Sequence, residues 1–168
     1  MQTIQKEYKV YSFDELSKEV KEKGISDNYD INGSYDWWND TYEDAKDIGL
    51  EITSFDLDRN RHAAGNFILA ANEVAQNIFN EHGEHCETYK TADDFMDKWQ
   101  PVFDNYMQTE EGEDELMELE DEFLKSLLED YSIMLQNEYE YLSSEEAIKE
   151  TIEANEYTFL EDGEMFNV

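Results

Sequence analysis

The chain of 168 residues has little proline, cysteine or glycine: one Pro, one Cys and seven Gly. With Cys86 alone, an internal disulfide is excluded, which suits a reducing compartment. So few prolines and glycines argue against long linkers and low-complexity segments. No run approaches the roughly 18 consecutive apolar residues of a membrane span, and the first residues lack the pattern of a signal peptide. We therefore expect a cytoplasmic protein that does not bind membranes.

Basic residues are also scarce, because 12 Lys and Arg stand against 44 Asp and Glu, for a formal net charge of −32. The part after residue 100 has 22 acids against only Lys125 and Lys149, a balance of −20. Such a field repels nucleic acid and membrane surfaces and attracts basic protein surfaces. Aromatic residues make up 14% of the chain, which is unlike a disordered acidic tail. We expect a single folded domain over residues 1–168, with a helical, strongly acidic C-terminal part at 110–155.

Hydrophobic periodicity predicts an α+β fold, in which five or six helices cover or flank a small antiparallel sheet. Residues 7–13 and 50–58 have the alternation of strands, and 66–69 would return as a hairpin partner of the second. The alternative for that partner is a helix beginning at Ala63, since alanines are frequent there. A C-terminal hairpin over residues 157–166 would turn at Asp162-Gly163.

The ends of the five or six expected helices are marked by capping residues, glycine and proline. Gly24 and Gly49 are predicted to end the first two, and Ser143 to begin the last with a capping box. Thr91 would begin the helix that Pro101 should kink or split. The predicted ranges are 14–23, 37–48, 71–82, 91–106, 113–141 and 143–154.

The helix over 113–141 is the most distinctive element, because residues 110–140 contain 13 acids and one lysine. At 1.5 Å per residue the segment would span about 46 Å, so one negative charge falls in about every 4 Å. Phosphates along one DNA strand lie at a similar spacing of about 3.4 Å. Two of the acids, Glu120 and Glu138, fall within the apolar stripe, and the acids that fall opposite it are Glu115, Glu118, Asp121, Glu122, Glu129 and Glu140. The candidate partner-binding residues are Glu110, Glu111, Glu113, Asp114, Glu115, Glu118, Asp121, Glu122, Glu129 and Glu140.

This acidity exceeds what solubility requires, which is a net charge of about 2–8 for a small domain. Like charges one turn apart, such as Glu118 and Glu122, also destabilise a helix by a few tenths of a kcal/mol. A surface that carries this repulsion indicates a partner that supplies the cations.

Two segments have a weak resemblance to metal sites. His82, His85 and Cys86 have the residue types of zinc ligands, but no second ligand pair follows, and a polar loop is the more ordinary interpretation. Residues 28–39 partly match a calcium loop, yet asparagine replaces the bidentate glutamate at its last position. We predict no metal and no cofactor.

No catalytic motif is present. Asp56 and Asp58 would share one face of a strand, where paired carboxylates can do acid–base chemistry but more often face solvent. The chain has neither a Gly-rich phosphate loop nor a Gly-x-Ser-x-Gly elbow. We therefore predict that the protein is not an enzyme, and its charge argues against direct binding of nucleic acid.

A set of segments spans nearly the whole chain and resembles a family of small acidic proteins encoded by bacteriophages and prophages. The resemblance rests on Tyr11–Ser17, Asp36–Trp38, Tyr42–Lys46, Ile48–Ile52, Phe55–Arg59, Ala71–Ala75, Glu81–Lys90 and Phe123–Tyr157. It implies a phage origin and action inside a bacterial cell, and it implies no catalytic residues.

Together these observations favour a DNA-mimic inhibitor of anti-CRISPR or anti-restriction type, whose partner is a basic nucleic-acid-binding host protein. One alternative is a structural or regulatory phage protein that binds through an apolar or aromatic surface around Trp37. Another is a small metal-binding module. A homodimer also fits, because a wide apolar stripe serves a dimer seam as well as a core.

Overall fold

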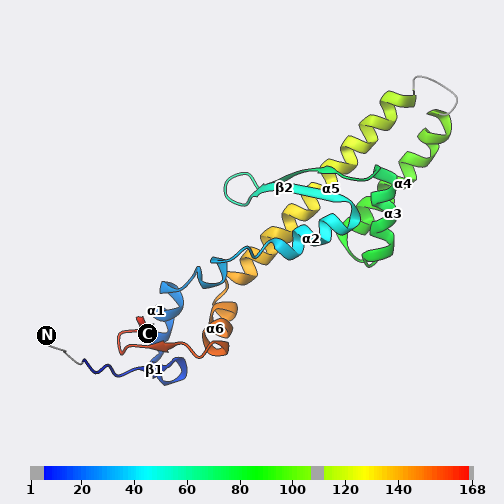
Figure 1. The fold of residues 1–168 in the computed structure, drawn as a ribbon. Coiled ribbons are helices and arrows are strands. Elements are labelled where there is room, and N and C mark those ends of the chain that lie inside the picture. The colour runs from blue at the N-terminus through cyan, green and yellow to red at the C-terminus, as the bar shows by residue number, and fades with distance from the viewer. Residues whose placement is uncertain (1–5, 107–111, 167–168) are drawn as a thin grey trace, which may run out of the picture. The chain divides into compact units, whose positions relative to one another are not determined.

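The computed structural model describes residues 6–106 and 112–166. Contacts divide the chain into two compact units, and each is described by itself. The central unit is Trp38–Asn137, and the terminal unit combines the residues up to Trp37 with those from Glu138 onward. Both contain helices and antiparallel strands, so the α+β prediction is confirmed (Figure 1). That the two units form one domain stays a prediction.

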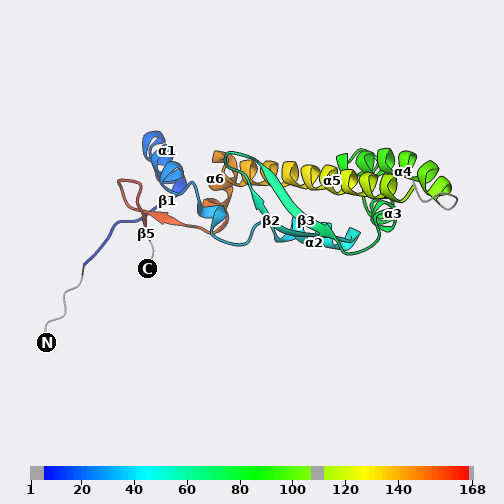
Figure 2. The ribbon, with the colours of Figure 1, turned by 90° about the horizontal axis from the view of Figure 1, so that it is seen from above.

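The central unit consists of a β-hairpin and four helices, of which α4 and α5 run side by side (Figures 1 and 2). The hairpin was the preferred interpretation of this segment and is confirmed. Gly49 ends the first helix in the left-handed conformation, with φ 98°, as its position predicted. The elements are α2 (Asn39–Ile48), β2 (Leu50–Asp56), β3 (His62–Phe67), α3 (Ala71–Glu81), α4 (Glu87–Tyr106) and α5 (Gly112–Leu142), whose last residues belong to the terminal unit.

The core of the central unit is a layer of apolar side chains contributed by all of its elements. At its centre Phe123 of α5 stacks on Phe95 of α4, with ring centroids 4.1 Å apart and planes nearly parallel. Phe67 of β3 contacts the same ring at 5.4 Å. These three rings hold the hairpin and α4 against one face of α5, which leaves the opposite face of that helix to solvent.

The terminal unit packs a three-stranded antiparallel sheet of order β1-β4-β5 beside short helices. Phe159 is fully buried in its core among Phe13, Leu16, Ile148 and Ile152. The predicted hairpin is confirmed, and Gly163 takes the positive φ of 86° that its turn requires. The elements are β1 (Tyr11–Ser12), η1 (Phe13–Glu15), α1 (Lys18–Asp27), η2 (Ile31–Gly33), the end of α5, α6 (Glu145–Ala154), β4 (Thr158–Phe159) and β5 (Met165–Phe166).

Several predicted element ends are wrong in the terminal unit. β1 has two residues rather than seven, and α1 begins at Lys18 and continues through Gly24 to Asp27. Gly24 lies inside α1 and does not end it; a Cβ there would stand 3.5 Å from the Phe159 ring, an ordinary contact distance. The cap of α6 is Ser144, whose Oγ accepts a hydrogen bond from the Ala147 amide.

Three predicted features also differ from the structure in the central unit. α4 begins at Glu87 rather than Thr91, with the Glu87 carboxylate in its first turn, where the helix dipole favours an acid. Pro101 does not split this helix. It is exposed, so water can satisfy the carbonyl that loses its donor. β3 begins at His62 and pairs through a bulge between Ile52 and Ser54.

Candidate functional site

The acidic surface of α5 is the first candidate. It consists of six exposed carboxylates in the first turns of the helix: Glu113, Asp114, Glu115, Glu118, Asp121 and Glu122. Leu116, Phe123 and Leu127 of the same helix are buried. Five of the six acids therefore lie away from the buried face, as the amphipathic pattern predicts, whereas Glu113 lies on the side of the half-buried Glu120.

No internal cation neutralises these six side chains. Among the residues that the structure describes, none of the six forms an ion pair or a side-chain hydrogen bond. Glu118 and Glu122 remain one turn apart on this surface, with their mutual repulsion uncompensated. Lys125 is exposed on the next turn.

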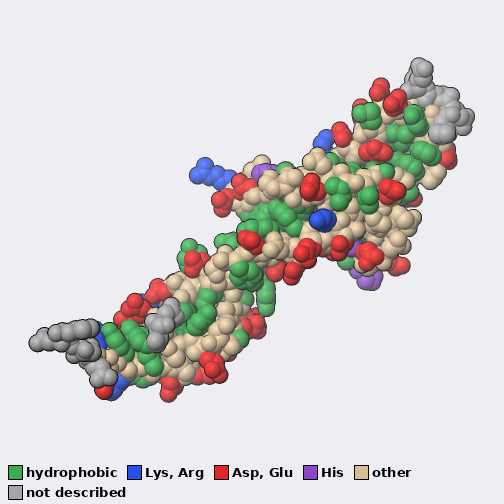
Figure 3. All heavy atoms as spheres, viewed as in Figure 1, with side chains coloured by type: hydrophobic (Ala, Val, Ile, Leu, Met, Phe, Trp, Pro, Cys, Tyr) green, Lys and Arg blue, Asp and Glu red, His purple; other side chains and the backbone are tan. Residues whose placement is uncertain are grey.

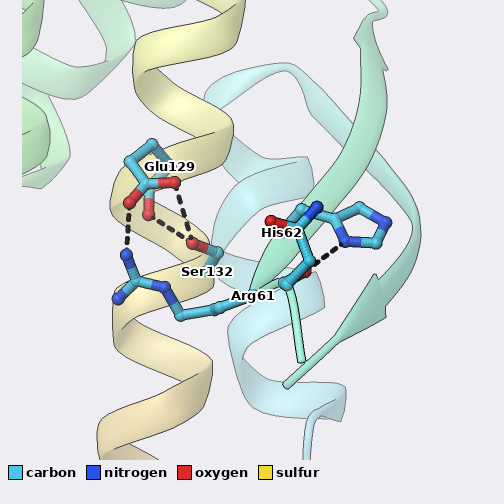
Figure 4. A network of polar contacts seen from close by, with 5 residues as sticks. Arg61, His62, Glu129 and Ser132 are labelled. Atoms are coloured by element: carbon cyan, nitrogen blue, oxygen red, sulfur yellow. Dashed lines mark hydrogen bonds and ion pairs between the residues drawn. The ribbon is translucent and has the colours of Figure 1, made fainter. Parts of the chain in front are cut away.

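Glu129 differs from the other predicted partner-binding residues because it is already paired. Its carboxylate binds the Arg61 guanidinium from the β2–β3 loop and accepts from the Ser132 hydroxyl (Figure 4). Glu129 therefore holds the hairpin to α5, and we exclude it from the acidic surface.

The remaining predicted residues have separate outcomes. Glu140 is exposed and belongs to the terminal unit, while Glu110 and Glu111 lie outside the described residues. Glu120 is half-buried as its place in the stripe predicted. Glu138 is exposed instead, because the last buried residue of α5 is Leu135.

Acidic side chains are not confined to α5. On the face drawn in Figure 3 they are spread over both units, among hydrophobic and uncharged side chains. What distinguishes α5 is the density of unpaired acids along one helix, and not the presence of acids.

A cavity in the central unit, lined by both apolar and acidic side chains, is the second candidate, and the sequence did not predict it. Its volume is about 430 Å³, within the range of small-molecule sites. We call it the His82 pocket. Its lining comes from the end of α2, the α3–α4 connection and α5: Asp44, Glu81, His82, Gly83, Cys86, Glu87, Thr88, Asp130, Ile133, Met134 and Asn137.

A chain of polar contacts fixes one wall of this pocket. The fully buried Tyr131 hydroxyl donates to Asp44 Oδ2 at 2.7 Å. Asp44 Oδ1 lies 3.5 Å from His82 Nε2, and His82 Nδ1 is hydrogen-bonded to the buried Thr88 hydroxyl at 2.7 Å. The His82 ring lowers the pKa of the Asp44 carboxyl, with a smaller lowering from Tyr131, against the effect of burial. Burial, with the Asp44 charge second, raises the pKa of Tyr131.

A second carboxylate of the pocket is held in an unfavourable environment. Asp130 Oδ2 accepts from the Thr91 hydroxyl at 2.7 Å. Burial nevertheless raises the pKa of Asp130, and the Glu87 and Glu129 charges add to the rise while Thr91 opposes it.

We expect Asp130→Asn to stabilise the central unit at neutral pH, by less than about 1 kcal/mol because solvent screens a partly exposed charge. The raised pKa means that the folded state binds this proton more tightly than the unfolded state does. The gain over wild type should therefore be full above the raised pKa and vanish as pH falls below the ordinary value, where wild type is protonated in both states. Urea unfolding across pH 3–8 measures it; a gain that persists at pH 3 contradicts this origin.

The weak metal candidates do not form a ligand set. His82 and Cys86 both line the pocket, but His85 is not among its lining residues, and no group of three or more candidate ligands occurs among the described residues. In the calcium-like segment, Asn32 is buried and binds the Leu142 carbonyl and the Thr151 hydroxyl, so its amide serves packing. Asp58 lies beyond the end of β2, and its amide donates to the Asp56 carboxylate in the turn.

The tryptophan pair is half-buried rather than an open platform. Trp37 contacts Tyr139, with ring centroids 5.7 Å apart, and Trp38 contacts Phe55 at the same distance.

Comparisons with known proteins returned no match: no protein-family model, curated protein or solved structure resembles the chain closely enough to be counted. Within the described ranges, no helix has the length and apolar character needed to cross a membrane.

Proposed function

We propose that this is a phage-encoded, non-enzymatic acidic binding protein that acts as a DNA mimic. It presents the acidic surface of α5 to the basic nucleic-acid-binding groove of a host defence protein, of CRISPR or restriction type. The observation that supports this most is the run of six exposed carboxylates within ten residues, unpaired among the described contacts, on a helix that buries Leu116 and Phe123.

The charge density of this surface suits the role. Ten helical residues rise about 14 Å, so six carboxylates give one charge per roughly 2 Å. Duplex DNA carries one charge per about 1.7 Å of axis when both strands are counted. A groove that binds phosphates with Lys and Arg would therefore meet a comparable field on α5.

The absence of internal ion pairs on this surface matters for affinity. A carboxylate that is already paired must lose its cation before it binds another, and these six have none to lose among the described residues. Electrostatic attraction of this kind accelerates association and weakens as salt screens it beyond about 10 Å at 0.1 M.

The test is capture from bacterial lysate on immobilised protein, after nuclease treatment to remove nucleic acid. We expect a nucleic-acid-binding protein to be retained at 50 mM salt and to elute, with at least tenfold loss, by 500 mM. Added duplex DNA should compete for the captured protein. If no nucleic-acid-binding protein is captured, or if capture is indifferent to salt, the proposal fails.

A further inference from the structure

We infer that the His82 pocket binds a guanidinium group carried on a short alkyl chain. The inference does not depend on the acidic surface of α5, which is separate from the pocket lining. It concerns a defined cavity with directed acceptors rather than a diffuse charge.

The charge of the lining selects a cation. Four carboxylates line the pocket, and no Lys or Arg is among its described lining residues. Lys90 neutralises Glu87 from outside the lining at 2.6 Å, which leaves Asp44, Glu81 and Asp130. Charges that are partly desolvated and unpaired favour a ligand that pairs with them.

The carboxylates that face the cavity are oriented in advance. Tyr131 holds one oxygen of Asp44, and Thr91 holds one oxygen of Asp130. The second oxygen of Asp130, Oδ1, makes no hydrogen bond among the described contacts, whereas Oδ1 of Asp44 lies 3.5 Å from His82 Nε2. A planar guanidinium has five N–H donors in a fixed fork, which matches several acceptors held in place better than a single ammonium does.

His82 fixes the position of the Asp44 carboxylate. Its side chain is only 9% exposed, its Nδ1 atom is hydrogen-bonded to the Thr88 hydroxyl, and its Nε2 atom lies 3.5 Å from Asp44 Oδ1. This distance is longer than that of a good hydrogen bond, and Nε2 makes none by geometric criteria. A guanidinium N–H that binds the Asp44 carboxylate would therefore add a closer pairing than the one that His82 supplies.

The rest of the cavity suits the alkyl chain. Ile133 and Met134 of α5 line it, and Met134 is 40% exposed. A flexible thioether at a pocket rim packs readily on an alkyl chain.

The experiment is titration of the full chain with butylguanidinium, followed by NMR of the backbone amides and His82 ring, with butylurea as the neutral ligand of matched shape. We expect butylguanidinium to shift the signals of His82, Thr88 and Ile133, and butylurea to bind at least tenfold more weakly. Equal binding of the two ligands, or shifts spread over the surface with none at the pocket, would overturn the inference.

Asp130→Asn and Asp44→Asn should each weaken butylguanidinium binding at least tenfold, whereas Asp93→Asn, an exposed acid of α4 outside the pocket, should not. Asp130→Asn is the decisive variant, because Asp44 also receives the Tyr131 hydrogen bond and its loss can disturb folding. If Asp130→Asn and Asp93→Asn bind equally to wild type, the pocket is not the site.

A second titration uses the peptide N-acetyl-Gly-Arg-Gly-amide. Binding of the peptide at the same signals assigns the pocket to an arginine side chain of a protein partner, and binding of butylguanidinium alone assigns it to a free small molecule. Both outcomes support a guanidinium site. Neither depends on salt-sensitive capture by α5, so the pocket and the proposed function can fail separately.

Discussion

Replacing Glu115, Glu118, Asp121 and Glu122 with lysine is expected to abolish capture of the basic partner while the central unit keeps its fold. All four are exposed and unpaired among the described residues, so no internal contact is lost. The i,i+4 repulsion of Glu118 and Glu122 is replaced by a similar repulsion between two lysines, so the change in stability should stay within a few tenths of a kcal/mol per pair. A variant that folds as wild type does yet does not bind would assign binding to this surface.

The expected loss of affinity is about a thousandfold. Each attraction lost near a protein surface is taken as about 1 kcal/mol, and four of them correspond to about 4 kcal/mol. Glu129 is excluded from this set, because its reversal would break the Arg61 pair and disturb the hairpin.

The matched control reverses four exposed acids elsewhere in the central unit: Glu43, Asp47, Asp93 and Asp97. Both sets change the net charge equally. Isothermal calorimetry against the captured partner and thermal unfolding measure the two effects. If both sets lower the affinity equally, net charge and not the acidic surface of α5 determines binding. If neither lowers it, binding occurs through another surface, such as that around Trp37.

Phe123→Ala should lower the free energy of unfolding by about 3–5 kcal/mol, as large aromatic truncations in cores do. The ring is buried between Phe95 and Phe67, so the change leaves a cavity that three elements border. A loss of this size is a large part of the 5–15 kcal/mol that typically stabilises a domain.

The control is Phe123→Leu, which keeps most of the buried volume and should cost clearly less. Urea denaturation followed by far-UV circular dichroism gives both values. A loss below about 1 kcal/mol for Phe123→Ala would show that the hairpin and α4 do not depend on this contact.

The elements that the sequence predicted well are those with a strong local signal. α5 has a long apolar period, and the hairpin from Leu50 to Phe67 has turn residues between two strands, so neighbours in sequence decide the structure. The predictions of a helix end at Gly24 and of a split helix at Pro101 were wrong. Whether these residues interrupt a helix depends on distant contacts and on exposure, which the local sequence does not show. Gly24 faces a phenylalanine 135 positions away in the chain, which no local rule can anticipate.

The difference between local patterns and distant contacts also explains why the sequence predicted one candidate site and not the other. The acidic surface lies within ten consecutive residues, so the pattern of the helix predicts it. The His82 pocket joins α2, α3, α4 and α5, and its residues are ordinary in their local context. The one available signal was Tyr131, whose hydroxyl falls on a buried stripe and therefore needs a partner.

The pairing of Arg61 with Glu129 also sets a limit on the size of any mimicry. Toward the C-terminus, Lys125 is the first positive charge after the six acids, and Arg61 then occupies the next carboxylate of that helix face. If α5 acts as a DNA mimic, its run of unpaired acids covers about 14 Å, which is less than half of one helical turn of duplex DNA at about 34 Å. We therefore expect the groove of a partner that binds α5 to contact an acidic surface no longer than a short oligonucleotide.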